Sequence, residues 1–218
     1  MRRVLVAVSL LGLLLVLTAS AAAAGDPRDE TVRLRPADVA LAKRISVRPG
    51  DVGAGWVRTP VQTSGGERLT CPGFDPDFSA FTITGRENVA YAQPNGTSII
   101  SFVEVYKSAR DAIGDFTLGA KPQVARCLGA SLQRQLDASA VIATVRSARV
   151  VAAPRVGDRR IAYRVIARLE AVGQRVDVYL DVVILQRGRS EVGLMFTSAR
   201  KPYARRSAIS AAVAGRMR

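Results

Sequence analysis

Ser198 and Lys201 have the most suggestive catalytic spacing in this sequence, because they form the Ser-x-x-Lys pattern in which a lysine activates a serine nucleophile. In that chemistry both side chains lie on one turn of a helix. Pro202 follows directly and disfavours a helix at Lys201. The partner sequences Ser-Asp-Asn and Lys-Thr-Gly are also absent. The pattern therefore does not predict a catalytic site.

Other residues that could do chemistry are few. The chain has no histidine, which excludes Ser-His-Asp and Cys-His catalysis and zinc bound by histidine. Asp75 and Asp77 lie in a proline-rich loop, and Asp111 and Asp115 are one helical turn apart. A calcium site needs more oxygen ligands than either pair supplies, so turn and capping roles are favoured. We expect no catalytic residue, no metal and no cofactor.

The remaining chemistry belongs to two cysteines, Cys71 and Cys127. The chain begins with the features of a secretory signal: a basic start at 1–3, an apolar stretch at 4–17 and small residues up to Ala24. An even number of cysteines in an exported chain predicts a disulfide. We therefore expect a Cys71–Cys127 bridge and a secreted or cell-envelope location. An uncleaved N-terminal anchor over 4–24 is the alternative.

Charge is the strongest sign of a binding role. The net charge is +14, and residues 141–218 alone hold 16 basic and 5 acidic side chains. A basic face could bind an anionic lipid, a cell-wall polymer or an acidic protein. Nucleic acid is not expected, because no nucleic-acid motif or aromatic stacking platform is present. The candidate anion-binding residues are Arg149, Arg155, Arg159, Arg160, Arg200, Lys201, Arg205 and Arg206.

The elements that position these residues predict an α+β domain. We divide the chain into a signal peptide at 1–24, a flexible leader at 25–35 and a single domain at 36–218. Apolar spacing predicts helices from Pro36, Ser108, Pro122 and Pro202. Strand character marks 81–84, 89–93 and 98–106, and four strands at 142–153, 159–170, 175–185 and 190–198 form an antiparallel meander.

The register of this meander can also be predicted. A loop at 171–174 places Glu170 opposite Arg175, and the same register pairs 168 with 177 and 164 with 181. Three opposite charges then share one face and apolar pairs share the other. A three-residue loop at 186–188 would pair 182 with 192, 180 with 194 and 178 with 196. The charged face should be solvated, so charge reversal at Asp181 should have a mild effect.

This arrangement resembles actinobacterial exported sensor-type domains, including the extracellular domains of receptor Ser/Thr kinases. It is also similar to small lipoproteins with a Mog1/PsbP-like α/β sandwich, although a lipobox cysteine is absent. The resemblance implies an antiparallel sheet packed against helices and supplies no catalytic residue. It rests on the segments 50–56, 81–85, 102–106, 108–112, 126–128, 156–158 and 186–189.

The sequence thus favours a non-catalytic envelope module that binds an anionic or apolar ligand or a partner. A hydrolase with an unrecognised carboxylate or Ser/Lys site is one alternative. An accessory subunit of a larger envelope complex is the other. An apolar cavity would favour the binding module, a deep polar cleft the hydrolase and a flat apolar patch the subunit.

Overall fold

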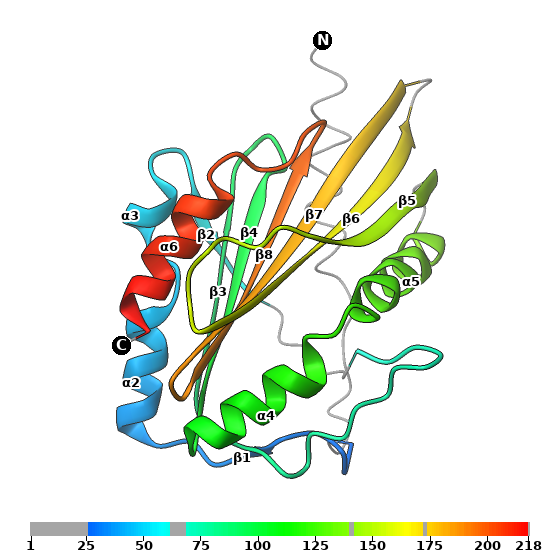
Figure 1. Cartoon of the computed structure of the whole chain (residues 1–218). Coiled ribbons are helices and arrows are strands. Elements are labelled where there is room, and N and C mark those ends of the chain that lie inside the picture. The colour runs from blue at the N-terminus through cyan, green and yellow to red at the C-terminus, as the bar shows by residue number, and fades with distance from the viewer. Residues whose placement is uncertain (1–25, 62–68, 140–141, 172–173, 218) are drawn as a thin grey trace.

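A computed structural model shows one sheet with helices on both of its faces, an α+β fold (Figure 1). It describes residues 26–61, 69–139, 142–171 and 174–217, so the predicted signal peptide at 1–24 lies outside the described residues. The strands follow the order β1-β3-β4-β8-β7-β6-β5, and β2 pairs with β3.

The bounds of the elements agree with most of the expected pattern. The strands are β1 (Thr31–Val32), β2 (Val57–Thr59), β3 (Thr82–Ala92), β4 (Ser98–Tyr106), β5 (Ile142–Val151), β6 (Arg159–Ala171), β7 (Gln174–Arg187) and β8 (Ser190–Ala199). The helices are α2 (Pro36–Ile45), α3 (Pro49–Val52), α4 (Ala109–Gly119), α5 (Val124–Asp137) and α6 (Arg206–Arg216).

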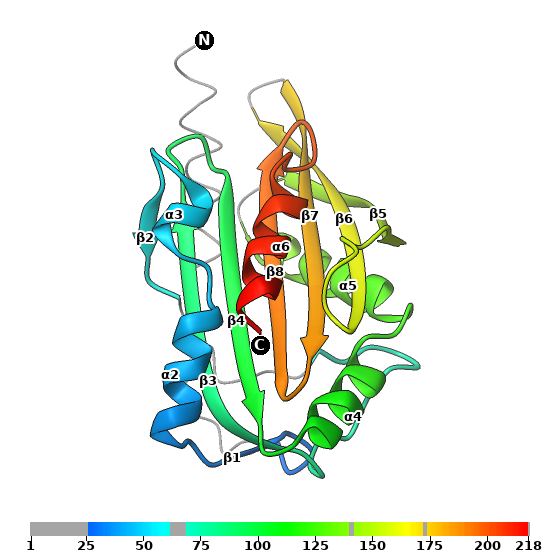
Figure 2. The same cartoon turned by 60° about the vertical axis from the view of Figure 1, so that its left-hand side comes forward.

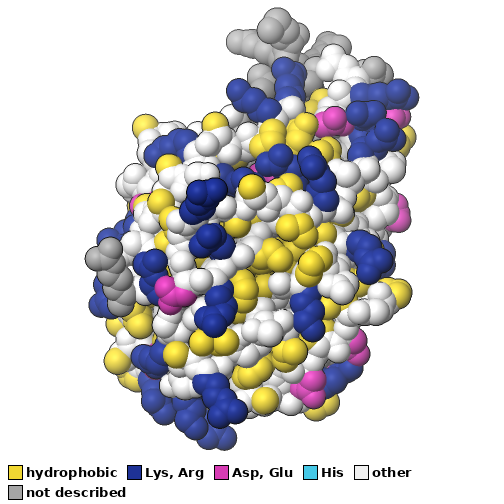
Figure 3. All heavy atoms as spheres, viewed as in Figure 1, with side chains coloured by type: hydrophobic (Ala, Val, Ile, Leu, Met, Phe, Trp, Pro, Cys, Tyr) yellow, Lys and Arg dark blue, Asp and Glu magenta, His cyan; other side chains and the backbone are white. Residues whose placement is uncertain are grey.

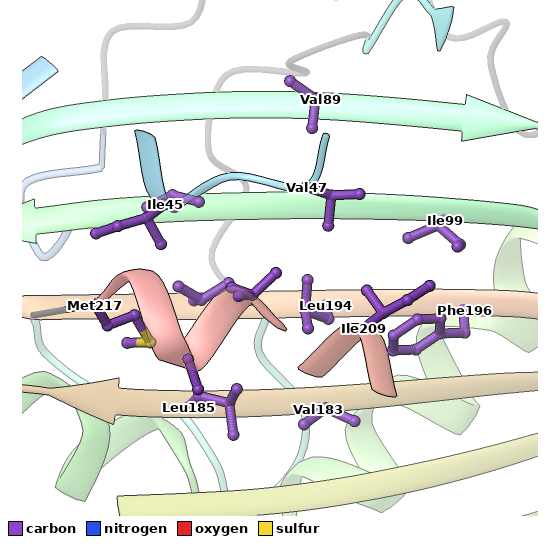
Figure 4. Close-up of a cluster of buried hydrophobic side chains, with 14 of the residues drawn as sticks. Ile45, Val47, Val89, Ile99, Val183, Leu185, Leu194, Phe196, Ile209 and Met217 are labelled. Carbon is purple, nitrogen blue, oxygen red and sulfur yellow. The ribbon is translucent and has the colours of Figure 1, made fainter. Parts of the chain in front are cut away.

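The main core lies between the sheet and the helices α2 and α6 (Figure 2). Ile45 of α2 and Ile209 of α6 are buried against Val183, Leu194 and Phe196 of the central strands (Figure 4). Successive strand residues point to opposite faces. The intervening residues Tyr163, Val182 and Ile184 accordingly pack with α5 on the other side. Both faces of the sheet are therefore covered by helices along much of β6 and β7.

The predicted register of the first meander hairpin is confirmed. Glu170 pairs with Arg175, Arg168 with Asp177 and Arg164 with Asp181. The second hairpin was predicted three residues out of register, because Val192 pairs with Leu185 and Phe196 pairs with Asp181. Its turn comprises Gly188 and Arg189, and Gly188 has a φ of +55°. Because the shift is odd, Asp181 lies on the same face of the sheet as Phe196 of the main core. This is the face that α6 covers.

The sequence predicted a flexible leader at 25–35, but part of that segment forms β1 at the edge of the sheet. Thr31 and Val32 pair in parallel with Thr82 and Ile83. The backbone amide of Thr31 donates to the carbonyl of Phe81 at 3.0 Å, and that of Arg33 donates to Ile83 at 2.8 Å. These bonds add the segment to the edge of the sheet, because β3 offers backbone partners there.

The Cys71–Cys127 disulfide is confirmed, with the two Cα atoms 5.3 Å apart. It joins the loop around Phe74 to the buried face of α5. Cys127 is fully buried and packs with Val124 and Tyr163. The bridge thus joins α5 to the loop around Phe74, on the side of the sheet opposite the main core.

Replacing both cysteines by alanine is expected to lower the free energy of unfolding by about 2–4 kcal/mol. The domain should still unfold cooperatively, because the main core contains neither cysteine. Urea unfolding followed by circular dichroism measures both quantities. An unchanged midpoint, or the absence of a cooperative transition, would contradict this expectation.

Candidate functional site

Arginines form rows across β5, β6 and β7 on the face that carries α6. Arg149 of β5 lies opposite Arg164 of β6, which lies opposite Asp181 of β7. Arg164 donates to both oxygens of Asp181, at 2.6 and 2.9 Å. Arg206 of α6 reaches the same carboxylate at 3.2 Å. Two guanidinium groups therefore hold one carboxylate that is only 1% exposed, and Arg149 adds a third arginine on the neighbouring strand.

A second row lies nearer the end of the β6–β7 hairpin. Arg168 donates to the two oxygens of Asp177 at 2.8 and 3.2 Å. These bonds hold the pKa of Asp177 below its ordinary value. Arg175 pairs with Glu170 at 3.0 Å, and both side chains are well exposed. This end of the sheet thus has the same pairing pattern as the first row, but in contact with water.

Arg200 completes an open groove at this end, together with Arg168, Arg175 and Asp177. Arg200 has a φ of +70°, and among the non-glycine residues of the described ranges it alone has this left-handed backbone conformation. The turn is held because the Arg200 amide donates to the Asp177 carbonyl at 2.7 Å. The Ser198 hydroxyl donates to the Lys201 carbonyl at 2.8 Å. Ser198 is therefore committed to the turn rather than directed at the Lys201 amine.

We call the two rows and the groove at Arg200 together the arginine surface. Figure 3 shows that this side of the molecule carries far more basic than acidic side chains. Its acids are Glu170, Asp177 and Asp181. Arg149 and Arg200 make no ion pair or side-chain hydrogen bond to the parts of the chain that are described. The basic members of the surface are Arg146, Arg149, Arg164, Arg168, Arg175, Arg200 and Arg206.

The eight candidate residues predicted from sequence do not all join this surface. Arg149, Arg200 and Arg206 belong to it. Arg159 begins β6 at its other end and donates to Gln186 at 3.1 Å. Arg205 donates to the carbonyls of Val52 and Asp51, which fixes α6 to α3. The exposed side chains of Arg155, Arg160 and Lys201 make no contact with the row around Asp181 among the described interactions.

Four further arginines of the surface, at 146, 164, 168 and 175, were outside the predicted set. Their sequence signal was the spacing of Arg164 and Arg168, which places both on one face of β6. That spacing was interpreted as structural ion pairing, and the pairing itself is correct. The surface emerges because Arg146 and Arg149 of β5 add two cations beside β6, where Arg149 lies opposite Arg164 rather than opposite an acid.

A second cluster of functional groups was not predicted at all. Glu104 of β4 lies directly opposite Glu191 of β8. Asp115 of α4 and Glu30 of the N-terminal segment complete what we call the acidic cluster. Arg86 donates to Glu104 at 2.7 Å, and the Tyr106 hydroxyl donates to it at 3.0 Å. The cluster escaped notice because β4 and β8 are neighbours only in space.

Burial changes the proton affinity of this cluster. Desolvation, reinforced by the charges of Glu104 and Glu30, raises the pKa of Asp115 to about 8. Burial also raises the pKa of Glu191 well above its ordinary value. Asp115 Oδ1 and Glu191 Oε2 are buried and lack a hydrogen-bond partner within the described structure. These two oxygens are thus placed where a negative charge is strongly disfavoured.

Two features are absent from the described ranges, a metal-binding group and a membrane-spanning helix. These ranges contain no group of three or more Asp, Glu, Cys or His residues arranged to hold a metal ion. Within the same ranges, every helix is too short or too polar to cross a bilayer.

Comparison with known proteins leaves the family open. Neither a known protein family nor a curated protein matches the chain. The extracellular domain of PknH from Mycobacterium tuberculosis is similar in structure, with 10% identity and a TM-score of 0.45, over 85% of this chain and 98% of that one. LpqN from the same organism, involved in cell envelope biogenesis, has 11% identity and a TM-score of 0.27, over 66% and 78%. A function must therefore be argued from the residues of this chain.

Proposed function

We propose that this protein is a non-catalytic module of the cell envelope that binds a linear anionic polymer through the arginine surface. The observation that carries the proposal is the excess of guanidinium groups over carboxylates on three adjacent strands. The confirmed disulfide and the signal-like N-terminus support a location outside the cytoplasm. A hydrolase and an accessory subunit remain the competing functions.

The spacing of the cations suits a ligand with repeated charges. Arg164 and Arg168 are four residues apart on β6, which separates their Cα atoms by about 13 Å. Each has a neighbouring cation that forms no ion pair with the described residues, Arg149 beside the first and Arg200 beside the second. A planar guanidinium can donate two parallel hydrogen bonds to a phosphate or carboxylate. Two such positions can bind one polymer chain with a combined affinity above that of either position alone.

The same geometry argues against hydrolysis at this surface. Ser198 is 6% exposed and its hydroxyl bonds to the backbone of the turn. The carboxylates of the surface are each paired with an arginine, and the hydrogen bonds from Arg168 lower the pKa of Asp177. Neither a nucleophile nor a general base is therefore presented to a ligand bound there.

Removing these two neighbouring cations, by Arg149→Gln with Arg200→Gln, is expected to weaken binding of inorganic polyphosphate about tenfold. The loss follows from two charge-assisted hydrogen bonds at a solvent-exposed site. Binding of the unaltered protein should also weaken from 20 to 300 mM salt, because salt screens exposed charges. Isothermal titration calorimetry measures both effects.

The matched control is Arg110→Gln with Arg126→Gln, which removes the same charge from exposed positions on α4 and α5. It should leave the affinity nearly unchanged. An equal loss in both double variants would reduce the effect to net charge. Salt-insensitive binding would favour an apolar ligand site instead. Stronger binding to anionic lipid vesicles than to polyphosphate would assign the surface to a membrane.

A further inference from the structure

The acidic cluster joins three parts of the chain that are remote in sequence. Glu30 comes from the N-terminal segment, Asp115 from α4, and Glu104 and Glu191 from the sheet. Glu191 alternates with Val192 of the main core, so the cluster lies on the sheet face opposite α6. None of the four carboxyl groups belongs to the arginine surface.

One basic group contacts these four carboxyl groups in the described structure. It is Arg86 of β3, and it pairs with Glu104. The other titratable groups that face the cluster are hydroxyls, Tyr106 of β4 and Tyr163 of β6. On β7 the residue opposite Glu191 is the uncharged Gln186. Four negative charges here would therefore be opposed by a single positive charge.

Protonation of some of these carboxyl groups reduces this excess of negative charge. Cross-strand partners have Cβ atoms about 5 Å apart, so Glu104 and Glu191 strongly disfavour being ionised together. Asp115 is 6% exposed, and its Oδ1, like Oε2 of Glu191, has no donor from the described chain. A carboxyl group in that position is held in its neutral form. Asp115 and Glu191 are therefore the sites that carry the protons.

We propose that the acidic cluster is a proton-controlled latch, which fastens α4 and residues 28–35 to the sheet while Asp115 and Glu191 are protonated. Loss of the two protons to solvent leaves two carboxylates beside Glu104 and Glu30. Their repulsion and the gain of hydration both favour release of α4 and the N-terminal segment. The main core contains no cluster residue, so the rest of the sheet stays folded.

The direction of the pH effect follows from the raised pKa values of Asp115 and Glu191. The fastened state holds more protons than the released state, in which both groups titrate near 4. The latch is therefore fully fastened below about pH 4 and loosens as the pH rises through about 8. The segment that it releases is bonded to the sheet through Thr31, Arg33 and Arg35, and Arg28 accepts from Phe78.

The test is hydrogen–deuterium exchange at pH 5.5 and pH 9, comparing the unaltered protein with Asp115→Asn/Glu191→Gln at each pH. The amide side chains keep the shape of a neutral acid and carry no titrating proton. Comparison at one pH cancels the chemical dependence of exchange. At pH 5.5, which is nearer the pH at which the latch is fully fastened, the two proteins should differ much less than at pH 9. At pH 9 residues 28–35 and 109–119 should exchange at least about tenfold faster in the unaltered protein. The reason is that each unit by which a pKa is displaced changes the equilibrium constant for opening by up to about tenfold.

The matched control is Asp137→Asn/Glu170→Gln, which makes the same chemical changes at the end of α5 and on the exposed end of β6. It should show the pH response of the unaltered protein. Glu191→Gln alone serves if the double variant does not fold, and it should give part of the same protection. Equal exchange of the unaltered protein and the latch variant at pH 9 would overturn the proposal. Loss of protection over β7 and β8 together with α4 would also overturn it, because the opening would then be global.

Discussion

Replacing Asp181 by alanine is expected to lower the free energy of unfolding by about 3–5 kcal/mol, because it breaks a buried ion pair. The carboxylate is buried between Arg164 and Arg206, and it accepts hydrogen bonds from both. Without it two guanidinium groups remain close together with no counter-charge. Arg206 begins α6, so the repulsion acts directly on the helix that covers the main core.

Asp177→Ala is the matched control, because Asp177, on the same face of β7 but nearer the start of the strand, makes the same two-oxygen contact with Arg168. Its side chain is 31% exposed, so water can solvate the arginine left behind. We expect a loss below about 1 kcal/mol. Urea unfolding at pH 7 gives both values. Similar losses at the two positions would show that burial of Asp181 contributes little.

The contrast between these two aspartates shows how far the sequence could be interpreted. The pairing of β6 with β7 was predictable, because opposite charges and apolar residues alternate in a single consistent register. The prediction that the charged face of the hairpin is solvated was wrong at Asp181, which is buried. The mild effect expected for charge reversal there rested on that premise, and we now expect a large one. The residues of α6 that bury Asp181 come 25 positions later, and the local pattern contains no trace of them.

The register of the second hairpin failed for a related reason. Helices cover both faces of β7, so Val182 and Val183 are both apolar and both pack, one against α5 and one against α6. Alternation of apolar and polar residues therefore does not select one register of β8 against β7. Gly188 is the remaining indication of where the turn lies. A strand covered on both sides gives a continuous apolar run with little register information.

The site residues followed the same rule. Cys71 and Cys127 were predictable because their chemistry leaves one partner for each. The acidic cluster depends on β4 lying beside β8, which pairs Glu104 with Glu191 although they are 87 residues apart in the chain, and on α4 lying close to them. Arg205 was selected by charge alone, whereas its guanidinium bonds to the backbone of α3. Composition thus indicated a basic surface but could not separate structural arginines from available ones.

Gly85→Ala is expected to destabilise the domain by about 3 kcal/mol, because α2 crosses β3 at this residue with no room for a side chain. A Cβ atom at Gly85 would lie 2.2 Å from the Asp38 carbonyl oxygen and 2.9 Å from the Val39 nitrogen. Both are backbone atoms, so no rotamer change relieves the contact. Gly85 is not among the glycines with positive φ, and the loss therefore comes from packing rather than from backbone strain.

Displacing α2 would disturb more than the contact itself. Asp38 bonds to Arg189 at 2.7 Å, and Arg189 also donates to the carbonyl of Tyr106 at 3.0 Å, so α2 is tied to β4 through the β7–β8 turn. Gly193→Ala is the control, because a Cβ on that strand glycine would meet only the Phe102 side chain at 3.8 Å. It should change stability by less than about 1 kcal/mol. Thermal and urea unfolding of both variants measure these effects. An equal, small loss of stability in the two variants would mean that α2 can move away from β3 at little cost. The contacts of Arg189 with Asp38 and Tyr106 would then also contribute little to stability.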